Sequence, residues 1–204
     1  MARAAAHGRL GVDWFSDPTA MALLPDDARG VVERFRTGPK PKGLRAGFAY
    51  GAMEHRARMM VARTVAVDHA VREAANPQLV ILGAGLDSFA WRRPDLLHTV
   101  RVFEVDHPAS QAWKLERVRD LALPLADSQV FVPVDFEAEP LRDALRTAGF
   151  DWGQPALFSW TGVAPYLTAP AIESTLRTIA GAAAGSEVVF SYRAEDSVLD
   201  DVGK

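Results

Sequence analysis

Cysteine is absent from all 204 residues. Its absence excludes disulfide bonds, thiolate nucleophiles and cysteine-ligated zinc. The five histidines are not spaced as metal ligands, so we expect no metal site. Long apolar runs are also lacking: none approaches the roughly 18 residues that cross a bilayer, and the alanine-rich start has no apolar signal-peptide core. These absences predict a cytoplasmic protein with no membrane partner.

The remaining composition predicts one globular domain overall, because 49% hydrophobic content over 204 residues can bury a sizeable core. The net charge of -3 hides an asymmetry: residues 1–75 carry 12 basic against 8 acidic side chains. A solvated helix surface explains this basic half better than a nucleic-acid partner. Aromatic residues are not interleaved with the basic ones, as single-strand binding requires.

Two regions follow one another along the chain, with a boundary near Asn76-Pro77. Residues 1–76 are rich in helix signals and predict a helical N-terminal extension. Within it, Asp17 is expected to cap a helix that Pro18 begins. Residues 51–75 lack internal proline, repeat apolar residues near helical spacing and predict one long helix.

Residues 77–204 alternate strand-like and helix-like segments, which predicts an α/β core with a parallel sheet and right-handed crossovers. The expected strands are residues 79–82, 100–104, 129–133, 155–159 and 186–192. The expected helices are residues 108–121, 137–147 and 169–183. Ligands in such folds bind at the carboxyl ends of the strands.

The first of these strands leads into Gly83-Ala84-Gly85, and about twenty residues later the second ends at Glu104-Val105-Asp106. Glycines there let a ligand approach the backbone, and an acid at this spacing binds ribose hydroxyls. A simple tight turn is the alternative for the glycines. Spacing does not choose between Glu104 and Asp106. Ser88 stands where a dinucleotide fingerprint has its third small residue, usually Gly or Ala.

Two further candidates follow later strands. Asp135-Phe136 comes after the third strand, where an acid can accept an adenine amino proton beside an aromatic ring, although helix capping is the simpler role. Tyr166 follows the fourth strand and either lines a substrate pocket or packs against the sheet.

Five sequence blocks carry a family resemblance. They are Trp14-Phe15-Ser16-Asp17-Pro18, Glu54-His55-Arg56-Ala57-Arg58, Leu82-Gly83-Ala84-Gly85-Leu86-Asp87-Ser88, Phe103-Glu104-Val105-Asp106-His107-Pro108 and Val134-Asp135-Phe136. From about Trp14 to Tyr192 the chain resembles the leucine carboxyl methyltransferase-like family of S-adenosyl-L-methionine-dependent methyltransferases, especially its bacterial O-methyltransferase branch. The resemblance implies a Rossmann-like class I methyltransferase sheet over residues 77–204. It also implies that the helical extension of residues 1–76 covers cofactor and substrate.

The resemblance also implies how the cofactor is held. Arg58 matches the helix arginine that binds the methionine carboxylate, and a guanidinium fork suits that group. Gly83 and Gly85 then face the amino-acid and ribose portions, and Asp106 matches the ribose-binding acid, with Glu104 in support.

At the adenine end, the resemblance assigns Asp135 and Phe136, and at the reactive end it assigns Tyr166 as the candidate catalytic residue. Protein-methylating members carry an acid where this chain has Thr161. This departure favours a small-molecule acceptor over a peptide carboxyl terminus.

The implied reaction is O-methylation of a carboxylate or hydroxyl on a small metabolite. A carboxylate acceptor needs no base, whereas a hydroxyl needs one, for which Tyr166, Glu54 and His55 are candidates. A catalytically silent cofactor-binding protein and a nicotinamide or flavin oxidoreductase are the alternatives.

Family members usually continue beyond the strand at Glu187 to Tyr192, so the resemblance also implies that C-terminal strands are missing. We therefore expect the last strand to be an apolar sheet edge, which favours self-association.

Overall fold

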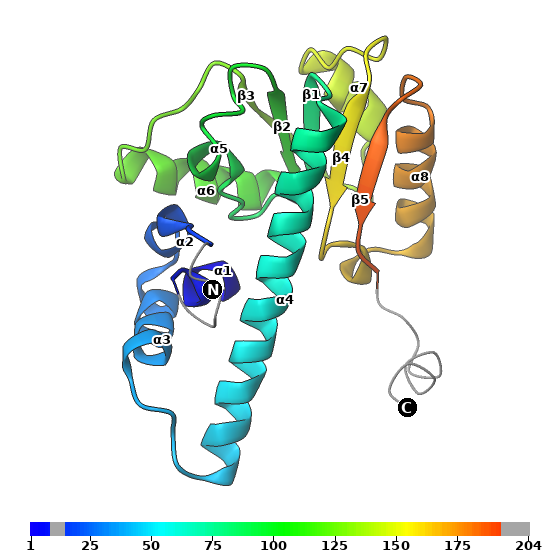
Figure 1. Ribbon diagram of the computed structural model, residues 1–204. Coiled ribbons are helices and arrows are strands. Elements are labelled where there is room, and N and C mark those ends of the chain that lie inside the picture. Colours follow the sequence, from blue (N-terminus) through cyan, green and yellow to red (C-terminus); the bar gives the residue numbers. More distant parts are fainter. Residues whose placement is uncertain (9–14, 193–204) are drawn as a thin grey trace.

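The computed structural model describes residues 1–8 and 15–192 (Figure 1). Its helices are α1 (Ala2–Ala6), α2 (Pro18–Ala22), α3 (Asp26–Thr37), α4 (Leu44–Ala74), α5 (Phe89–Arg92), α6 (Pro108–Asp120), α7 (Leu141–Thr147) and α8 (Ala169–Ala180), together with the 3₁₀ helix η1 (Ala164–Tyr166). Its strands are β1 (Gln78–Leu82), β2 (Arg101–Asp106), β3 (Gln129–Pro133), β4 (Ala156–Trp160) and β5 (Glu187–Phe190). Trp14, in the first sequence block, lies outside the described residues.

The strands of the described residues form one parallel sheet in the order β3-β2-β1-β4-β5. The chain moves outward from β1 through β2 to β3, then returns to the other side of β1 to place β4 and β5. Ligands in such sheets bind outside the carboxyl ends of the strands, where the strand order reverses. In this protein that point lies between β1 and β4, and the predicted Rossmann-like α/β fold is confirmed.

Helices cover both faces of the sheet, which explains why β1 is buried at every position. Val80 and Leu82 pack in a cluster that includes side chains from α7 and α8. Leu79 and Ile81, which point to the opposite face, pack with Val67 from α4 and with side chains of α5. The core is therefore divided into two layers by the sheet.

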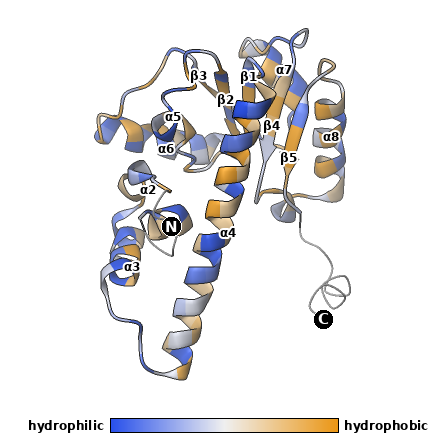
Figure 2. Cartoon of the chain, in the orientation of Figure 1, coloured by the Kyte–Doolittle hydropathy of each residue, from blue (hydrophilic) through white to orange (hydrophobic). Residues whose placement is uncertain are grey.

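Helix α4 begins at Leu44, seven residues before the predicted start at residue 51, although it contains Gly47 and Gly51. Glycine inside a helix costs about 1 kcal/mol relative to alanine, so tertiary contacts must offset it. Near its amino end the ring of Tyr50 lies 4.6 Å from that of Phe35 in α3. Further along, α4 packs against α1 and then the sheet, where its hydrophobic colouring is strongest (Figure 2).

The other predicted elements agree with the structure to within a few residues, except that α7 begins at Leu141, not residue 137. Pro140 occupies the N-cap position of α7, and a residue before proline is disfavoured in helical conformation. Helices α1 to α4 precede the first strand (Figure 1). The division into parts at residue 76 stays a prediction.

Strand β5 forms one edge of the sheet, and its Val188 is 43% exposed. Self-association through this strand stays a prediction. Among the described helices, none combines the length and apolarity that a membrane crossing requires.

Candidate cofactor and acceptor site

A cavity of about 620 Å³ opens at the carboxyl ends of β1 and β4. Its walls come from α1, from one face of α4, from the loop after β1 and from the loop after β4. Among the residues that line it are Arg3, His55, Arg56, Met59, Met60, Arg63, Gly83, Asp87, Arg92, Thr161, Gly162, Val163 and Tyr166. The volume lies within the range of about 300–1,000 Å³ that is usual for small-molecule sites.

The glycine loop after β1 takes a conformation that favours glycine, with φ of +67° at Gly83 and +50° at Gly85. A Cβ at Gly83 would lie 2.2 Å from Cγ2 of Val163, so this glycine allows the loop after β4 to pack closely. A Cβ at Gly85 would meet no atom within 4 Å. Of the two, Gly85 leaves space for a ligand to approach the backbone.

Asp106 ends β2 beside this loop. Its Oδ2 accepts a hydrogen bond of 2.6 Å from the Gly85 amide, and its Oδ1 accepts one of 2.8 Å from the His107 amide. The carboxylate therefore stands at the carboxyl edge of the sheet, against the glycine loop. Its assignment to ribose stays a prediction.

Glu104, the other acid at this spacing, is fully buried and forms an ion pair with Lys114 of α6. Its Oε1 also accepts a hydrogen bond of 2.8 Å from the Gln129 side chain. Burial raises the pKa of Glu104, although Lys114 and Gln129 act in the opposite direction. Glu104 therefore holds α6 and β3 to β2 from inside the core, and Asp106 is the acid that reaches the edge.

Asp135 and Phe136 follow β3, next to Asp106, whose carbonyl accepts a 2.8 Å hydrogen bond from the Val134 amide. Oδ1 of Asp135 accepts a 3.0 Å hydrogen bond from the Glu137 amide, and Phe136 packs against the core. Neither residue lines the cavity, so their adenine-binding role stays a prediction that depends on their place at the same sheet edge.

Arg58 points away from the cavity. Its side chain is 61% exposed, and its guanidinium forms an ion pair of 2.8 Å with Glu54 one turn earlier in α4. Because successive residues of a helix are rotated by 100°, Arg58 lies roughly 140° around α4 from Arg63. The structure thus does not bring Arg58 together with the glycine loop.

Arg63 is the α4 arginine that lines the inner part of the cavity, whereas the residue expected from the sequence was Arg58. Its Nη1 lies 3.3 Å from the position that a Cβ of Gly162 would occupy, in the loop after β4. Within the described part of the chain, Arg63 has no ion-pair partner. The signal that could have found it is helical phase, because Arg63 lies one turn before Val67, which packs on the sheet.

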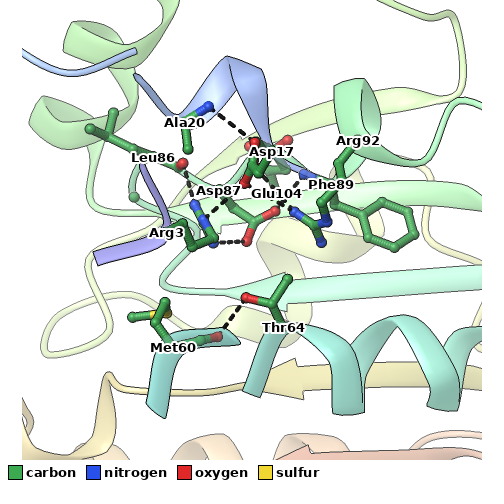
Figure 3. A network of polar contacts seen from close by, with 12 residues as sticks. Arg3, Asp17, Ala20, Met60, Thr64, Leu86, Asp87, Phe89, Arg92 and Glu104 are labelled. Atoms are coloured by element: carbon green, nitrogen blue, oxygen red, sulfur yellow. Dashed lines mark hydrogen bonds and ion pairs between the residues drawn. The ribbon is translucent and has the colours of Figure 1, made fainter. Parts of the chain in front are cut away.

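A buried polar network joins α1 and α2 to the residues after the glycine loop (Figure 3). Arg3 of α1 donates a 2.7 Å hydrogen bond to Oδ2 of Asp87 and another to the Leu86 carbonyl. Asp17 accepts a 3.0 Å hydrogen bond from the Ala20 amide, which confirms the predicted cap of α2. The network therefore fixes the helical extension to the wall of the cavity.

The same network keeps Asp87 charged. Burial opposes its ionisation, but the positive charges of Arg3, Arg92 and Lys114 outweigh burial and lower the pKa of Asp87 to about 2. Arg92 in turn donates to Asp68 of α4 over 2.7 Å. Arg3 and Arg92 are thus neutralised within the cavity wall.

Tyr166 lies in η1 at the mouth of the cavity and is 85% exposed. Thr161 also lines the cavity, as does His55 from α4, whereas Glu54 does not. Two of the three candidate bases therefore line the cavity. No cluster of three potential metal ligands occurs among residues 1–8 and 15–192.

A sequence model of the leucine carboxyl methyltransferase family matches residues 1–180. The chain belongs to the leucine carboxyl methyltransferase family. This confirms the resemblance noted from the sequence.

Relatives in this family are provisionally named S-adenosyl-L-methionine-dependent methyltransferases. One from Bacillus subtilis, YktD, is 40% identical over 119 residues, which cover 58% of this chain and 39% of the relative. Another, from Mycobacterium marinum, is 34% identical over 194 residues, or 91% of this chain and 61% of the relative. The chain thus spans 39% to 61% of the length of these two relatives.

Two solved structures share the fold. A DUF574 family protein from Streptomyces avermitilis has a TM-score of 0.55 at 16% identity, covering 91% of this chain and 72% of its own. A protein from Thermobifida fusca, provisionally described as a methyltransferase, has a TM-score of 0.52 at 19% identity, covering 92% of this chain and 64% of its own. At these identities the likeness concerns the fold alone.

Proposed function

We propose that this protein is an S-adenosyl-L-methionine-dependent methyltransferase that methylates an oxygen of a small molecule, either a carboxylate or a hydroxyl. The observation that carries the proposal is the cavity at the sheet's reversal point, where the guanidinium of Arg63 lines the same space as the glycine loop. A cation beside a loop with room for a ligand suits a cofactor that has a carboxylate at one end and a nucleoside at the other.

The residues present fit that cofactor if it extends from the cavity along the edge of the sheet. Arg63 and Gly83 line the cavity, whereas Gly85, Asp106, Asp135 and Phe136 lie at the adjoining sheet edge, outside it. In this proposal Arg63, rather than Arg58, binds the methionine carboxylate, and the backbone around Gly85 faces the middle of the cofactor. Asp106 binds the ribose hydroxyls, and Asp135 with Phe136 receives the adenine. When bound, the cofactor supplies an electrophilic methyl group on sulfur.

The chain's own contribution is mainly orientation. Holding an acceptor oxygen in line with a reacting group can contribute about 7–11 kcal/mol to catalysis. Tyr166 of η1 and His55 of α4 both line the cavity, and they are the candidates to accept the proton of a hydroxyl acceptor. Thr161 carries no charge, whereas protein-methylating members of the family carry an acid at this position. This difference supports a small molecule over a peptide as acceptor.

Calorimetry with S-adenosyl-L-homocysteine and with NAD tests the cofactor. We expect the former to bind and NAD not to, and selective binding of NAD would favour the oxidoreductase alternative. Arg63→Gln should weaken S-adenosyl-L-homocysteine binding by about 10- to 100-fold, because hydrogen bonds to charged groups contribute about 1.5–3 kcal/mol. Arg58→Gln is the matched control and should change affinity by less than about twofold, as expected for an exposed pair.

Turnover separates an enzyme from a silent binding protein. The protein is incubated with methyl-labelled S-adenosyl-L-methionine and a metabolite extract, and the labelled products are identified. Label in an ester or ether would support O-methylation. Cofactor binding without any labelled product would favour the silent alternative.

A further inference from the structure

The cavity has an excess of positive charge that one cofactor carboxylate does not use. Four arginines line it, of which Arg3 is paired with Asp87, as Figure 3 shows, and Arg92 is paired with Asp68 of α4. Asp87 is the one acid among the described lining residues. Arg56 and Arg63 form no ion pair with any residue that the structure describes. Two guanidinium groups therefore remain available to ligands.

These two arginines occupy one stripe of α4 at different depths. Seven residues separate them, which corresponds to about two helical turns and about 10 Å along the axis, with nearly the same direction around the helix. Arg63 lies at the inner end, near Gly162, whereas Arg56 is exposed toward the mouth. Met59 and Met60 line the wall between them. The outer part of the cavity thus combines an apolar, adaptable wall with a cation at its rim.

We propose that Arg56 determines acceptor specificity by binding an anionic group of the methyl acceptor. The acceptor is then a small molecule with an apolar body, which packs on Met59 and Met60, and a carboxylate or phosphate, which the Arg56 fork binds. This inference rests on the proposed function, because Arg63 must be occupied by the cofactor for Arg56 to be the cation left for the acceptor.

An exposed arginine is often only a solvated surface group. A second exposed arginine of α4, Arg58, allows this alternative to be tested. Arg58, two residues later, is also exposed, but it is paired with Glu54 and lies outside the cavity. Arg58→Gln removes one positive charge from the same helix as Arg56→Gln does, but it leaves the cavity lining unchanged. Arg58→Gln is therefore the matched control for Arg56→Gln.

The test uses 4-phenylbutyrate, 4-phenylbutyl phosphate and the neutral 4-phenylbutyramide as probes, with S-adenosyl-L-homocysteine at saturation. Affinities are measured by NMR titration on the unsubstituted chain, on Arg56→Gln and on Arg58→Gln. The unsubstituted chain and Arg58→Gln should each bind at least one of the two acids about fivefold more tightly than the amide. A fivefold preference is the upper end of what a solvent-screened ion pair contributes to affinity. In Arg56→Gln the preference should fall below twofold.

The outcomes separate the two proposals. If S-adenosyl-L-homocysteine does not bind, the proposed function fails, and this inference fails with it. If it binds but neither acid is preferred, if no probe binds, or if Arg56→Gln retains the preference, then the role of Arg56 is refuted while the cofactor assignment stands. The acid that binds more tightly identifies the anionic group that the acceptor carries.

Discussion

The ion pair between Glu104 and Lys114 lies beneath the proposed ribose site, and Lys114→Met is the perturbation that tests its importance. The side chains are 0% and 1% exposed. Lys114 also donates a 2.6 Å hydrogen bond to the carbonyl of Asp87, so it connects β2 to the residue that follows the glycine loop. Replacing it by methionine keeps an unbranched apolar chain but leaves the Glu104 carboxylate buried without its cation.

Removing one partner of a buried ion pair typically costs about 3–5 kcal/mol. Because a domain is stable by only about 5–15 kcal/mol, we expect Lys114→Met to lose at least about a fifth of the total. The double variant Glu104→Gln with Lys114→Met should lose less than Lys114→Met alone. It removes both charges, and an amide oxygen at position 104 can still accept the hydrogen bond from Gln129.

Urea unfolding followed by circular dichroism at pH 7 measures these free energies as a double-mutant cycle, with a coupling of about 2–3 kcal/mol expected. The pH dependence adds a second measurement. Burial raises the pKa of Glu104, so the folded state retains a proton that the unfolded state has lost, and stability falls as pH rises above the usual range of a glutamate. Without Lys114 this fall should extend to higher pH.

Two results would contradict the prediction that Lys114→Met strands a buried charge at Glu104. One is a cost below about 1 kcal/mol for Lys114→Met, far less than a stranded buried charge requires. The other is additivity, in which the double variant loses as much as the two single variants together. Either would mean that the folded protein holds no buried Glu104 charge that depends on Lys114.

Two further predictions concern the glycine loop and Asp87. Gly83→Ala should destabilise the protein by more than about 2 kcal/mol, since its Cβ would overlap Val163 in addition to the left-handed strain. Gly85→Ala should cost only the strain, about 1–2 kcal/mol, and thermal unfolding of the two variants would contradict this if their order were reversed. For Asp87, a folded pKa of about 2 against an ordinary 3.8 contributes about 2 kcal/mol that is present above pH 4 and lost as pH falls toward 2. Urea unfolding between pH 5 and 2.5 should show this acid limb reduced in Asp87→Asn, and an unchanged limb would exclude Asp87 as its source.

Local sequence signals were sufficient for the sheet. β1 is buried on both faces and therefore has a continuous apolar run, and proline or glycine separates it from its neighbours. The start of α4 could not be found in the same way. Gly47 and Gly51 weaken the helix signal at this end of α4, and the apolar side chains of Leu44 and Phe48 are exposed. Its contact with Phe35 of α3 depends on tertiary packing.

The polar network could not be predicted from local sequence signals, because its contacts join residues far apart in the chain. Arg3 and Asp87 are 84 residues apart, and neither position has a pattern that names the other. Local sequence alone indicates a helix cap at Asp87, and its Oδ1 does accept a 2.7 Å hydrogen bond from the Phe89 amide. The second carboxylate oxygen, which binds Arg3, makes it part of the cavity wall as well.

The proposed site required two choices: whether Arg58 or Arg63 binds the cofactor carboxylate, and whether Glu104 or Asp106 binds ribose. The two choices differ in whether the periodicity of the element can decide between the residues. Arg58 and Arg63 belong to one helix, and five residues turn them to different sides of it. Because Val67 packs on the sheet, helical phase relative to Val67 favours Arg63. Glu104 and Asp106 belong to one strand and share a face, since side chains alternate with a period of two. Only depth separates them: Asp106 ends the strand, and Glu104 lies about 7 Å further inside. The end of β2 therefore had to be located within one residue to choose Asp106 as the proposed ribose acid from physical reasoning.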